Sequence, residues 1–372
     1  MSLVTELKRT VLKSDYDDLK SKKTESLINN IHENLAYYWR AHPWVNHPTS
    51  DDNQSWNTTI WVKELGKFIS VGFNVALDPP IPFVQYSVDG LNWTGVSNVP
   101  AEGWISLAWS PETQTLVAVS IEGGGANSTG IMTSTDGGLT WTSRNAPSRE
   151  QFSNVIWVAD LGLFVMSSIS GTNRIHTSPD GITWTGRTAA AQSRWTSLEY
   201  SKELGLLVSV ASQTGTDRGI QIMVSGDAIN WVSATVPEPI QWVSVAWSAE
   251  LGIFVGVEYD GVNKVMTSSD GFNWNVHPST LNNVSNNSKW TKVIWVKELN
   301  YFLAVAKFTS NASPNDYLIM TSTNGINWVP QKDPDMTLRG TWSTVAWSPE
   351  LFMLVATAQT GTNRSMVVKF VN

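Results

Sequence analysis

Residues 104–141 read WISLAWSPETQTLVAVSIEGGGANSTGIMTSTDGGLTW, and this stretch decides the fold. Trp104–Trp109 alternates large apolar residues with small ones, which predicts a strand, and a second apolar run follows at Leu116–Val119. A glycine-rich loop then leads to a third short strand at Ile131–Thr133, and the turn at Ser134–Gly138 leads to a fourth. Four short segments joined by turn residues predict one antiparallel sheet.

The same unit recurs along most of the chain. An aromatic residue opens its first strand at Trp56, Trp104, Phe152, Trp195, Trp242, Trp290 and Trp342. The steps between these residues are 48, 48, 43, 47, 48 and 52. A second aromatic residue follows five positions later, at Trp61, Trp109, Trp157, Tyr200, Trp247, Trp295 and Trp347. Seven copies of a four-stranded unit predict an all-β, seven-bladed β-propeller of antiparallel blades.

The last copy lacks its outer strand, which suggests how the ring closes. The turn and tryptophan that begin the fourth strand occur six times, ending at Trp93, Trp141, Trp184, Trp231, Trp274 and Trp328. Residues 39–43, WRAHP, match residues 274–278, WNVHP, in their Trp, His and Pro. We therefore expect a strand near residues 37–44 to complete the last blade, so that the propeller domain spans residues 36–372.

Residues 1–35 differ in kind from the repeats. Apolar residues recur at helical spacing from Leu3 to Leu12 and again from Leu27 to Leu35. This pattern predicts a helical segment, with disorder as the alternative, and the helical prediction has two open interpretations. It packs on the rim of the propeller, or it attaches and oligomerises the propeller by binding other subunits of a virion or tail.

Composition excludes several classes of protein. A net charge of −7 argues against nucleic-acid binding, and no apolar run is long enough to span a membrane. The chain contains no cysteine and its N-terminus lacks the apolar core of a secretion signal. Two locations stay open, namely a virion or other extracellular particle surface and the cytoplasm. No residue pattern predicts a metal site or a cofactor.

Two sets of polar residues are candidates for function. The turns between first and second strands carry an acid at Glu64, Glu112, Asp160, Glu203, Glu250, Glu298 and Glu350. We interpret these acids as turn and solubility residues, because one carboxylate per blade is too widely spaced for a metal site. Loops after the second strand repeat Gly-Thr-Asn/Asp-Arg, and we predict ligand contacts at Asn173, Arg174, Arg218, Asn363 and Arg364. A repeated hairpin turn with solvated arginines is the alternative.

The turn at Ser134–Trp141, STDGGLTW, resembles the Asp-box of sialidases and other BNR-repeat propellers. Related turns place the box residue at Asp89, Asp136, Asp180, Asp227, Asp270 and Asn324. The resemblance implies that these residues are structural and that they brace the hairpin. The chemistry of the residues also favours a structural role, because Asp and Asn side chains stabilise turns by accepting hydrogen bonds from nearby backbone N–H groups.

The resemblance does not extend to catalytic residues. Sialidases use an arginine triad, a Tyr/Glu pair and an acid Asp, and no set of residues in this chain is assigned to that site. The sequence predicts a non-catalytic binding propeller without catalytic residues, similar to surface or tail proteins of phages and giant viruses, that recognises a surface glycan or receptor protein. The alternatives are an Asp-box glycoside hydrolase and an intracellular scaffold propeller.

Overall fold

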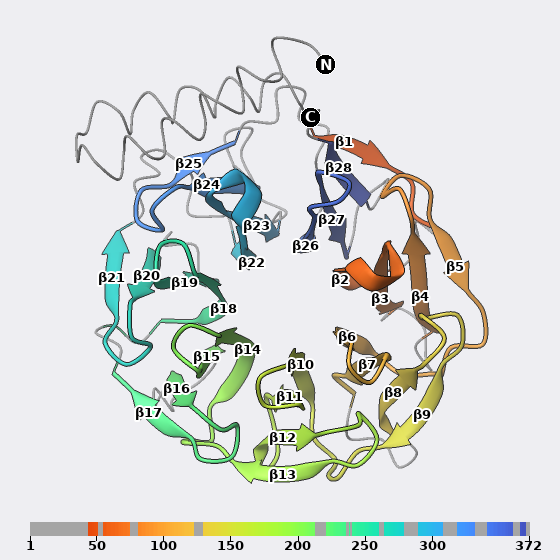
Figure 1. The fold of residues 1–372 in the computed structure, drawn as a ribbon, viewed down its shortest axis with the longest axis horizontal. Helices are drawn as coiled ribbons and strands as arrows, with labels where there is room; N and C mark the ends of the chain where they lie inside the picture. Colours follow the sequence, from red (N-terminus) through yellow and green to blue (C-terminus); the bar gives the residue numbers. More distant parts are fainter. Residues whose placement is uncertain are drawn as a thin grey trace.

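The computed structural model describes residues 44–50, 55–74, 81–122, 129–212, 221–235, 238, 240–259, 264–278, 289–307, 318–331, 341–359 and 365–369. These residues form seven four-stranded antiparallel sheets, arranged as blades around a central axis (Figure 1). The predicted seven-bladed propeller is confirmed. The predicted helical segment at residues 1–35 lies outside the described residues. None of the described helices is long and apolar enough to cross a membrane.

Each blade is built from strands that follow one another in the chain, with the first strand at the axis and the fourth at the rim (Figure 1). Blades 1 to 3 contain β2 (Ser55–Val62), β3 (Lys67–Asn74), β4 (Ile81–Ser87) and β5 (Thr94–Val96); β6 (Trp104–Ser110), β7 (Thr115–Ser120), β8 (Gly130–Ser134) and β9 (Thr142–Asn145); and β10 (Phe152–Val158), β11 (Leu163–Ser168), β12 (Arg174–Ser178) and β13 (Thr185–Thr188). Blades 4 to 6 contain β14 (Arg194–Ser201), β15 (Leu206–Ser212), β16 (Ile222–Ser225) and β17 (Val232–Ala234); β18 (Trp242–Ser248), β19 (Ile253–Glu258), β20 (Lys264–Ser268) and β21 (Asn275–Pro278); and β22 (Lys289–Val296), β23 (Tyr301–Lys307), β24 (Ile319–Ser322) and β25 (Val329–Pro330). Short 3₁₀ helices, η1 (Lys63–Leu65) and η2 (Lys297–Leu299), form the first turns of blades 1 and 6.

The seventh blade joins the two ends of the described chain. It contains β26 (Trp342–Ser348), β27 (Met353–Ala358), β28 (Ser365–Lys369) and β1 (Val45–His47). β1 pairs antiparallel with β28, so an N-terminal strand closes the ring. The strand lies at Val45–His47, which corrects the predicted position near residues 37–44.

The displacement has a clear origin, because the Trp-x-x-His-Pro motif occurs twice in succession, at residues 39–43 and 44–48. Asn46 is the partner of Met366 in blade 7, as Val276 is the partner of Met266 in blade 5. Residues 44–48 are therefore the equivalent of residues 274–278. Trp44 packs against the hydrophobic cluster between blades 6 and 7, which adds an anchor beside the strand.

The core lies between the blades. Seven hydrophobic clusters fill the seven interfaces between neighbouring blades, including the closing interface between blades 7 and 1. The aromatic residue that opens each first strand is at most 2 % exposed in all seven blades. Burial of this many large side chains supplies the main free energy that holds the blades together.

The turns between third and fourth strands share one hydrogen-bond pattern. At Asp89, Asp136, Asp180, Asp227, Asp270 and Asn324, one side-chain oxygen accepts from the serine hydroxyl two residues earlier and from two backbone N–H groups of the turn. The backbone N–H of Asn273 outweighs partial burial and lowers the pKa of Asp270 to about 2. These side chains therefore brace their own turns.

A second set of hydrogen bonds links each blade to the next. The second aromatic residue of every first strand donates to the acid in the first turn of the preceding blade. The pairs are Trp61–Glu350, Trp109–Glu64, Trp157–Glu112, Tyr200–Asp160, Trp247–Glu203, Trp295–Glu250 and Trp347–Glu298. We call this ring the aromatic–acid belt. The acids that we interpreted as turn and solubility residues thus also connect the blades.

Candidate ligand site in the axial cavity

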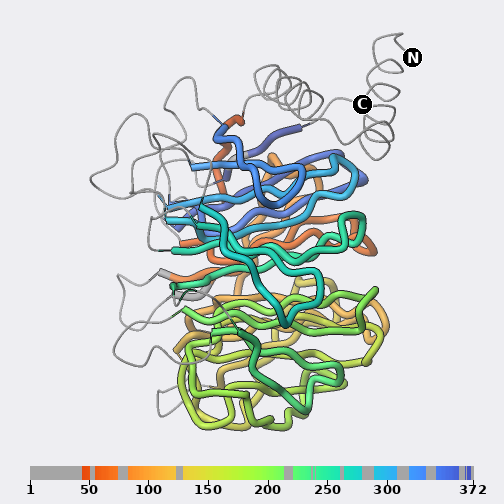
Figure 2. The backbone as a smooth tube through the Cα atoms, turned by 90° about the vertical axis from the view of Figure 1, so that its left-hand side faces the viewer, coloured from red at the N-terminus to blue at the C-terminus, as the bar shows by residue number. Residues whose placement is uncertain are grey.

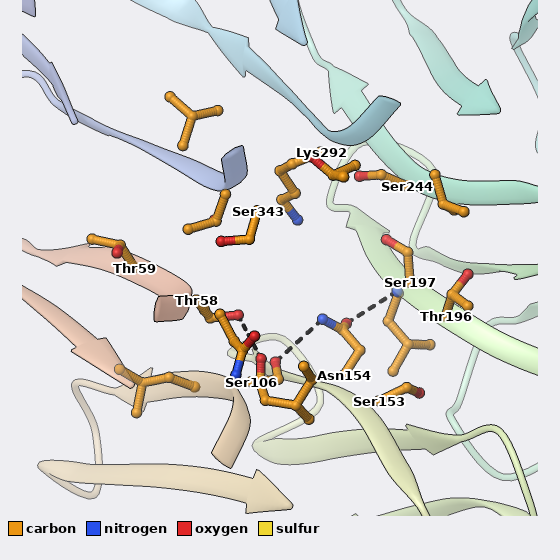
Figure 3. Close-up of a pocket in the computed structure, with 18 of the residues that line it drawn as sticks. Thr58, Thr59, Ser106, Ser153, Asn154, Thr196, Ser197, Ser244, Lys292 and Ser343 are labelled. Atoms are coloured by element: carbon orange, nitrogen blue, oxygen red, sulfur yellow. Dashed lines mark hydrogen bonds between the residues drawn. The ribbon is translucent and has the colours of Figure 1, made fainter. Parts of the chain in front are cut away.

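The first strands of the blades surround an axial cavity of about 600 Å³ (Figure 3). The turns between first and second strands lie at one end of the propeller, which we call the turn face. The second strands end and the third strands begin at the opposite end, which we call the loop face. Figure 2 shows the strands in side view, running between the two faces. Each first strand begins at the loop face and ends at the turn face.

A β-bulge directly after the first aromatic residue occurs in all seven first strands. An extra residue in a bulge redirects side chains away from the regular alternation. Thr291 Oγ1 donates to the carbonyl of Trp342 in the next blade at 2.7 Å, and Asn57 Nδ2 donates to the carbonyl of Trp104 at 3.0 Å. The bulges therefore place polar groups where they join neighbouring blades near the cavity wall.

The next residue of each first strand forms a ring around the axis. Its members are Thr58, Ser106, Asn154, Ser197, Ser244, Lys292 and Thr344, all of which line the cavity. We call them the polar ring. Three of its serines accept from a backbone N–H of the following blade, as in the bond from Val293 N to Ser244 Oγ at 3.1 Å. Asn154 accepts from Leu198 N in the same way.

Two charged side chains interrupt the regular lining. Lys292 replaces the small polar residue of the ring in blade 6, and Figure 3 shows its side chain extending into the cavity. Glu199 in blade 4 lies two residues after Ser197 of the polar ring. The equivalent residues of the other blades are Ile or Ala. Burial raises the pKa of Glu199 to about 7, although the positive charge of Lys292 opposes this shift. Burial lowers the pKa of Lys292, and the charge of Glu199 partly restores it.

Two further cations line the cavity toward the loop face. Arg194 begins β14 and Lys307 ends β23, and both strand ends lie at that face. Burial lowers the pKa of Lys307, and repulsion from Lys289 lowers it further. The described lining therefore carries three cations, with Glu199 as its single carboxylate.

The predicted ligand contacts at Asn173 and Arg174 lie in a braced hairpin of blade 3. The Arg174 guanidinium donates to the carbonyls of Gly171, Ile169 and Ser193 and to the Gln192 side chain. It is half-buried and engaged within its own loop region. The Asn173 N–H donates to the Glu150 carboxylate. A role for these residues in ligand binding stays a prediction, and Arg218, Asn363 and Arg364 lie outside the described residues.

Glu150 explains why this hairpin is well braced. Its buried carboxylate accepts from the backbone N–H groups of Thr172, Asn173 and Arg174 and is bonded to His176 Nε2 at 3.0 Å. Burial alone would raise the pKa of Glu150, but these bonds and the His176 contact outweigh it and lower the pKa to about 2. The carboxylate therefore stays charged and holds the loop.

The geometry limits the chemistry available to the cavity. Glycoside hydrolysis ordinarily requires two carboxylates flanking the scissile bond. Glu199 is the one carboxylate among the described lining residues, and its charged neighbour is Lys292 rather than a second acid. Within the described ranges, no group of three His, Cys, Asp or Glu side chains could hold a metal ion.

Lys292 and Glu199 were not among the residues predicted from the sequence. A signal was present, because aligning the seven first strands shows a lysine among serine, threonine and asparagine and a glutamate among isoleucine and alanine. Recognising its meaning required knowing which residues of a bulged strand line the axis.

Comparison with known proteins supports the fold. No family model and no curated protein sequence matches the chain. Solved structures match at TM-scores near 0.6. YCF48 from Cyanidioschyzon merolae is 12 % identical with a TM-score of 0.59, and the match covers 88 % of this chain and 98 % of that one. The Cps50 (Swd1) β-propeller domain of Myceliophteria thermophila is 10 % identical with a TM-score of 0.60, covering 88 % and 100 %.

Two further solved structures show the range of proteins that share this architecture. A chain of the mitotic checkpoint complex is 14 % identical with a TM-score of 0.61, covering 88 % of this chain and 91 % of that one. The GH74 xyloglucanase of Xanthomonas campestris is 12 % identical with a TM-score of 0.63, and the match covers 86 % of this chain but 53 % of the xyloglucanase. At these identities the likeness shows the fold alone, because one propeller fold hosts unrelated functions.

Proposed function

We propose that this chain is a non-catalytic binding propeller that recognises a surface glycan through its axial cavity and the loop face around it. The observation that carries the proposal is the cavity lining, in which hydroxyl and amide side chains form a ring and a single carboxylate is opposed by a lysine. Such groups match the donors and acceptors of sugar hydroxyls, and the cavity lacks a described carboxylate pair for hydrolysis.

Two half-buried indoles add to this match. Trp61 and Trp347 line the cavity toward the turn face. Aromatic side chains provide apolar area beside polar groups, a combination that suits sugar rings. A setting on a virion or tail, with residues 1–35 as the attachment segment, is part of the proposal and rests on composition and on the resemblance to Asp-box propellers.

A scaffold that assembles proteins is the second candidate. One of the matching structures is a chain of the mitotic checkpoint complex, so this architecture occurs in a protein assembly. In that case we expect the loop face to bind a protein and to ignore sugars.

The test is a glycan array probed with the full chain, followed by mass spectrometry of the recovered sugar. We expect retention of an unshortened glycan. Replacing Ile294, which lines the cavity, provides a matched pair of variants. Ile294→Trp should narrow the cavity and weaken binding, whereas Ile294→Leu should preserve it, with thermal denaturation confirming that both variants fold. A shortened sugar would overturn the non-catalytic proposal, and absence of any bound sugar would favour the scaffold.

A further inference from the structure

Residues equivalent to Lys292 in other blades form hydrogen bonds between neighbouring blades. Ser106, Ser197 and Ser244 each accept a hydrogen bond from the following blade through the hydroxyl oxygen. An ammonium group has three donors and no acceptor, so Lys292 cannot accept this bond from Val345 N–H. Its side chain instead extends into the cavity (Figure 3). Lys292 therefore cannot form this connection from blade 6 to blade 7, and it places a cation at the axis instead.

The charge of Lys292 is incompletely balanced within the described structure. No hydrogen bond or ion pair joins its Nζ to another described residue, and Glu199 acts on it through space. With a pKa of about 7, Glu199 is partly protonated at neutral pH, so its charge compensates Lys292 only in part. Lys292 is half-buried, and a partly desolvated cation without a close partner is unfavourable, a cost that a bound anion relieves.

The rest of the cavity has the same electrostatic character. Arg194 and Lys307 add positive charge toward the loop face, although the chain as a whole carries a net charge of −7. The acids of the aromatic–acid belt lie at the opposite, turn face. A recessed cavity with low-dielectric walls focuses the field of its charges and raises the local concentration of ions of opposite sign. Anions are therefore favoured to enter from the loop face.

We propose that the axial cavity binds an anionic group, a carboxylate or a phosphate, with Lys292 as the ionic contact and side chains of the polar ring as neutral hydrogen-bond donors. Ser244 in the preceding blade and Thr344 in the following blade place hydroxyl groups in the same cavity as the lysine. The proposal rests on the proposed function, because it names the chemical group recognised at the same cavity. It does not depend on which kind of molecule contains that anionic group.

Binding is coupled to protons at both charged residues. An anion beside Lys292 favours its charged form, and the same anion disfavours the charged form of Glu199. Both effects favour bound protons, and proton uptake near neutral pH is expected at Glu199, whose pKa is about 7. This coupling distinguishes the cavity from lysines on the surface.

The experiment is isothermal titration calorimetry of the full chain with inorganic phosphate and with citrate, at pH 7 in two buffers of different ionisation enthalpy. The two probes distinguish a phosphate from a carboxylate source. We expect binding of the probes, and the proton uptake at Glu199 is read as the difference between the unaltered chain and Glu199→Gln, because protons exchanged by the probe itself cancel in that difference. Lys292→Ser introduces the residue type found at Ser197 and Ser244. It should weaken binding by about tenfold to a hundredfold, since the free energy of a hydrogen bond to a charged group corresponds to a change in affinity of this size. Glu199→Gln should tighten binding by about threefold, because it removes a nearby like charge.

Lys202→Ser is the matched control, because Lys202 is an exposed lysine at the turn face that pairs with Asp160. It should bind both probes as the unaltered chain does. If a variant at Lys292 fails to fold, the Lys292 Cε resonance in the unaltered protein gives the same answer, since it should shift during the titration. Equal affinity of Lys292→Ser and the unaltered chain, weaker binding by Glu199→Gln, or an unmoved resonance would overturn the proposal.

The outcomes separate this inference from the proposed function. Phosphate or citrate binding that depends on Lys292, without any glycan on the array, would support the anion site and reject glycan recognition. Glycan binding without measurable binding of either anion would reject the anion site alone.

Discussion

The aromatic–acid belt predicts a measurable coupling between neighbouring blades, and the Trp295–Glu250 pair offers the sharpest test. Trp295 Nε1 donates to Glu250 Oε2 at 2.7 Å, and Lys297 Nζ lies 3.1 Å from Glu250 Oε1. The Glu250 side chain is 22 % exposed, so solvent screens the bond only in part. Trp295→Phe removes the donor and preserves an aromatic ring against Phe302, whose ring centroid lies 4.7 Å away in a tilted contact.

The expected coupling is about 1 kcal/mol, because a hydrogen bond to a charged acceptor contributes about 1.5–3 kcal/mol when buried and less at a partly exposed site. The measurement is a double-mutant cycle of Trp295→Phe and Glu250→Gln, with unfolding free energies from urea denaturation. In the equivalent pair Trp347–Glu298 the acid is exposed, so this pair serves as a control with a smaller expected coupling.

The coupling should also depend on pH. Burial by itself would raise the pKa of Glu250, but its hydrogen bonds and the Lys297 contact outweigh this and lower the pKa below the ordinary value of 4.5. A lowered pKa in the folded state stabilises the fold at neutral pH, and this contribution disappears as the pH falls below 4.5 through the folded-state pKa. Zero coupling at pH 7, or coupling that grows in acid, would refute the reasoning.

Three further changes test other parts of the fold by urea denaturation. Deleting residues 1–43 should change the unfolding free energy little, whereas deleting residues 1–48 also removes β1 and should lower it by about 3 kcal/mol or more; equal effects would contradict ring closure by β1. Gly252→Ala should cost about 1 kcal/mol because its φ is +63°, and Gly271→Ala should cost more, since its φ is +76° and a Cβ there would lie 2.6 Å from a leucine Cδ2. Because the pKa of Glu150 falls from 4.5 to about 2 on folding, Glu150 should contribute up to about 3 kcal/mol to the stability lost between pH 4.5 and 2, and Glu150→Gln should lack this contribution.

The fold could be predicted because its information is local and repeated. Each aromatic residue that opens a first strand recurs at nearly constant steps, and each turn before the fourth strand carries its own bracing residue. The closing strand was harder to place, because the two Trp-x-x-His-Pro motifs are equally compatible with the pattern. Pairing with β28 selects the second motif, at residues 44–48, and this choice depends on contacts between the two ends of the chain. The resemblance to Asp-box propellers stays a prediction, since none of the comparisons tests it.

Contacts between blades could not be predicted from the repeat alone. The acids and the second aromatic residues were both visible as periodic positions, but each pair joins residues such as Trp109 and Glu64 from different copies. Their meeting depends on the rotation between blades, which the sequence does not specify. Arg174 illustrates a second limit of prediction from the repeat. An arginine in a repeated loop suggested a ligand contact, and in the structure its guanidinium donates hydrogen bonds to nearby backbone carbonyls.

Lys292 affects both the stability of the fold and the proposed binding of an anion. The residues of a natural fold usually agree with their local environment, and exceptions concentrate at functional sites. Three ring serines accept an N–H from the next blade, and Lys292→Ser would offer Val345 N–H the same acceptor. It would also remove a half-buried cation, so the unfolding free energy should rise by about 1 kcal/mol in urea denaturation while anion binding is lost. A less stable Lys292→Ser chain would show that the lysine serves the fold, and the argument for a ligand at the axis would lose its foundation.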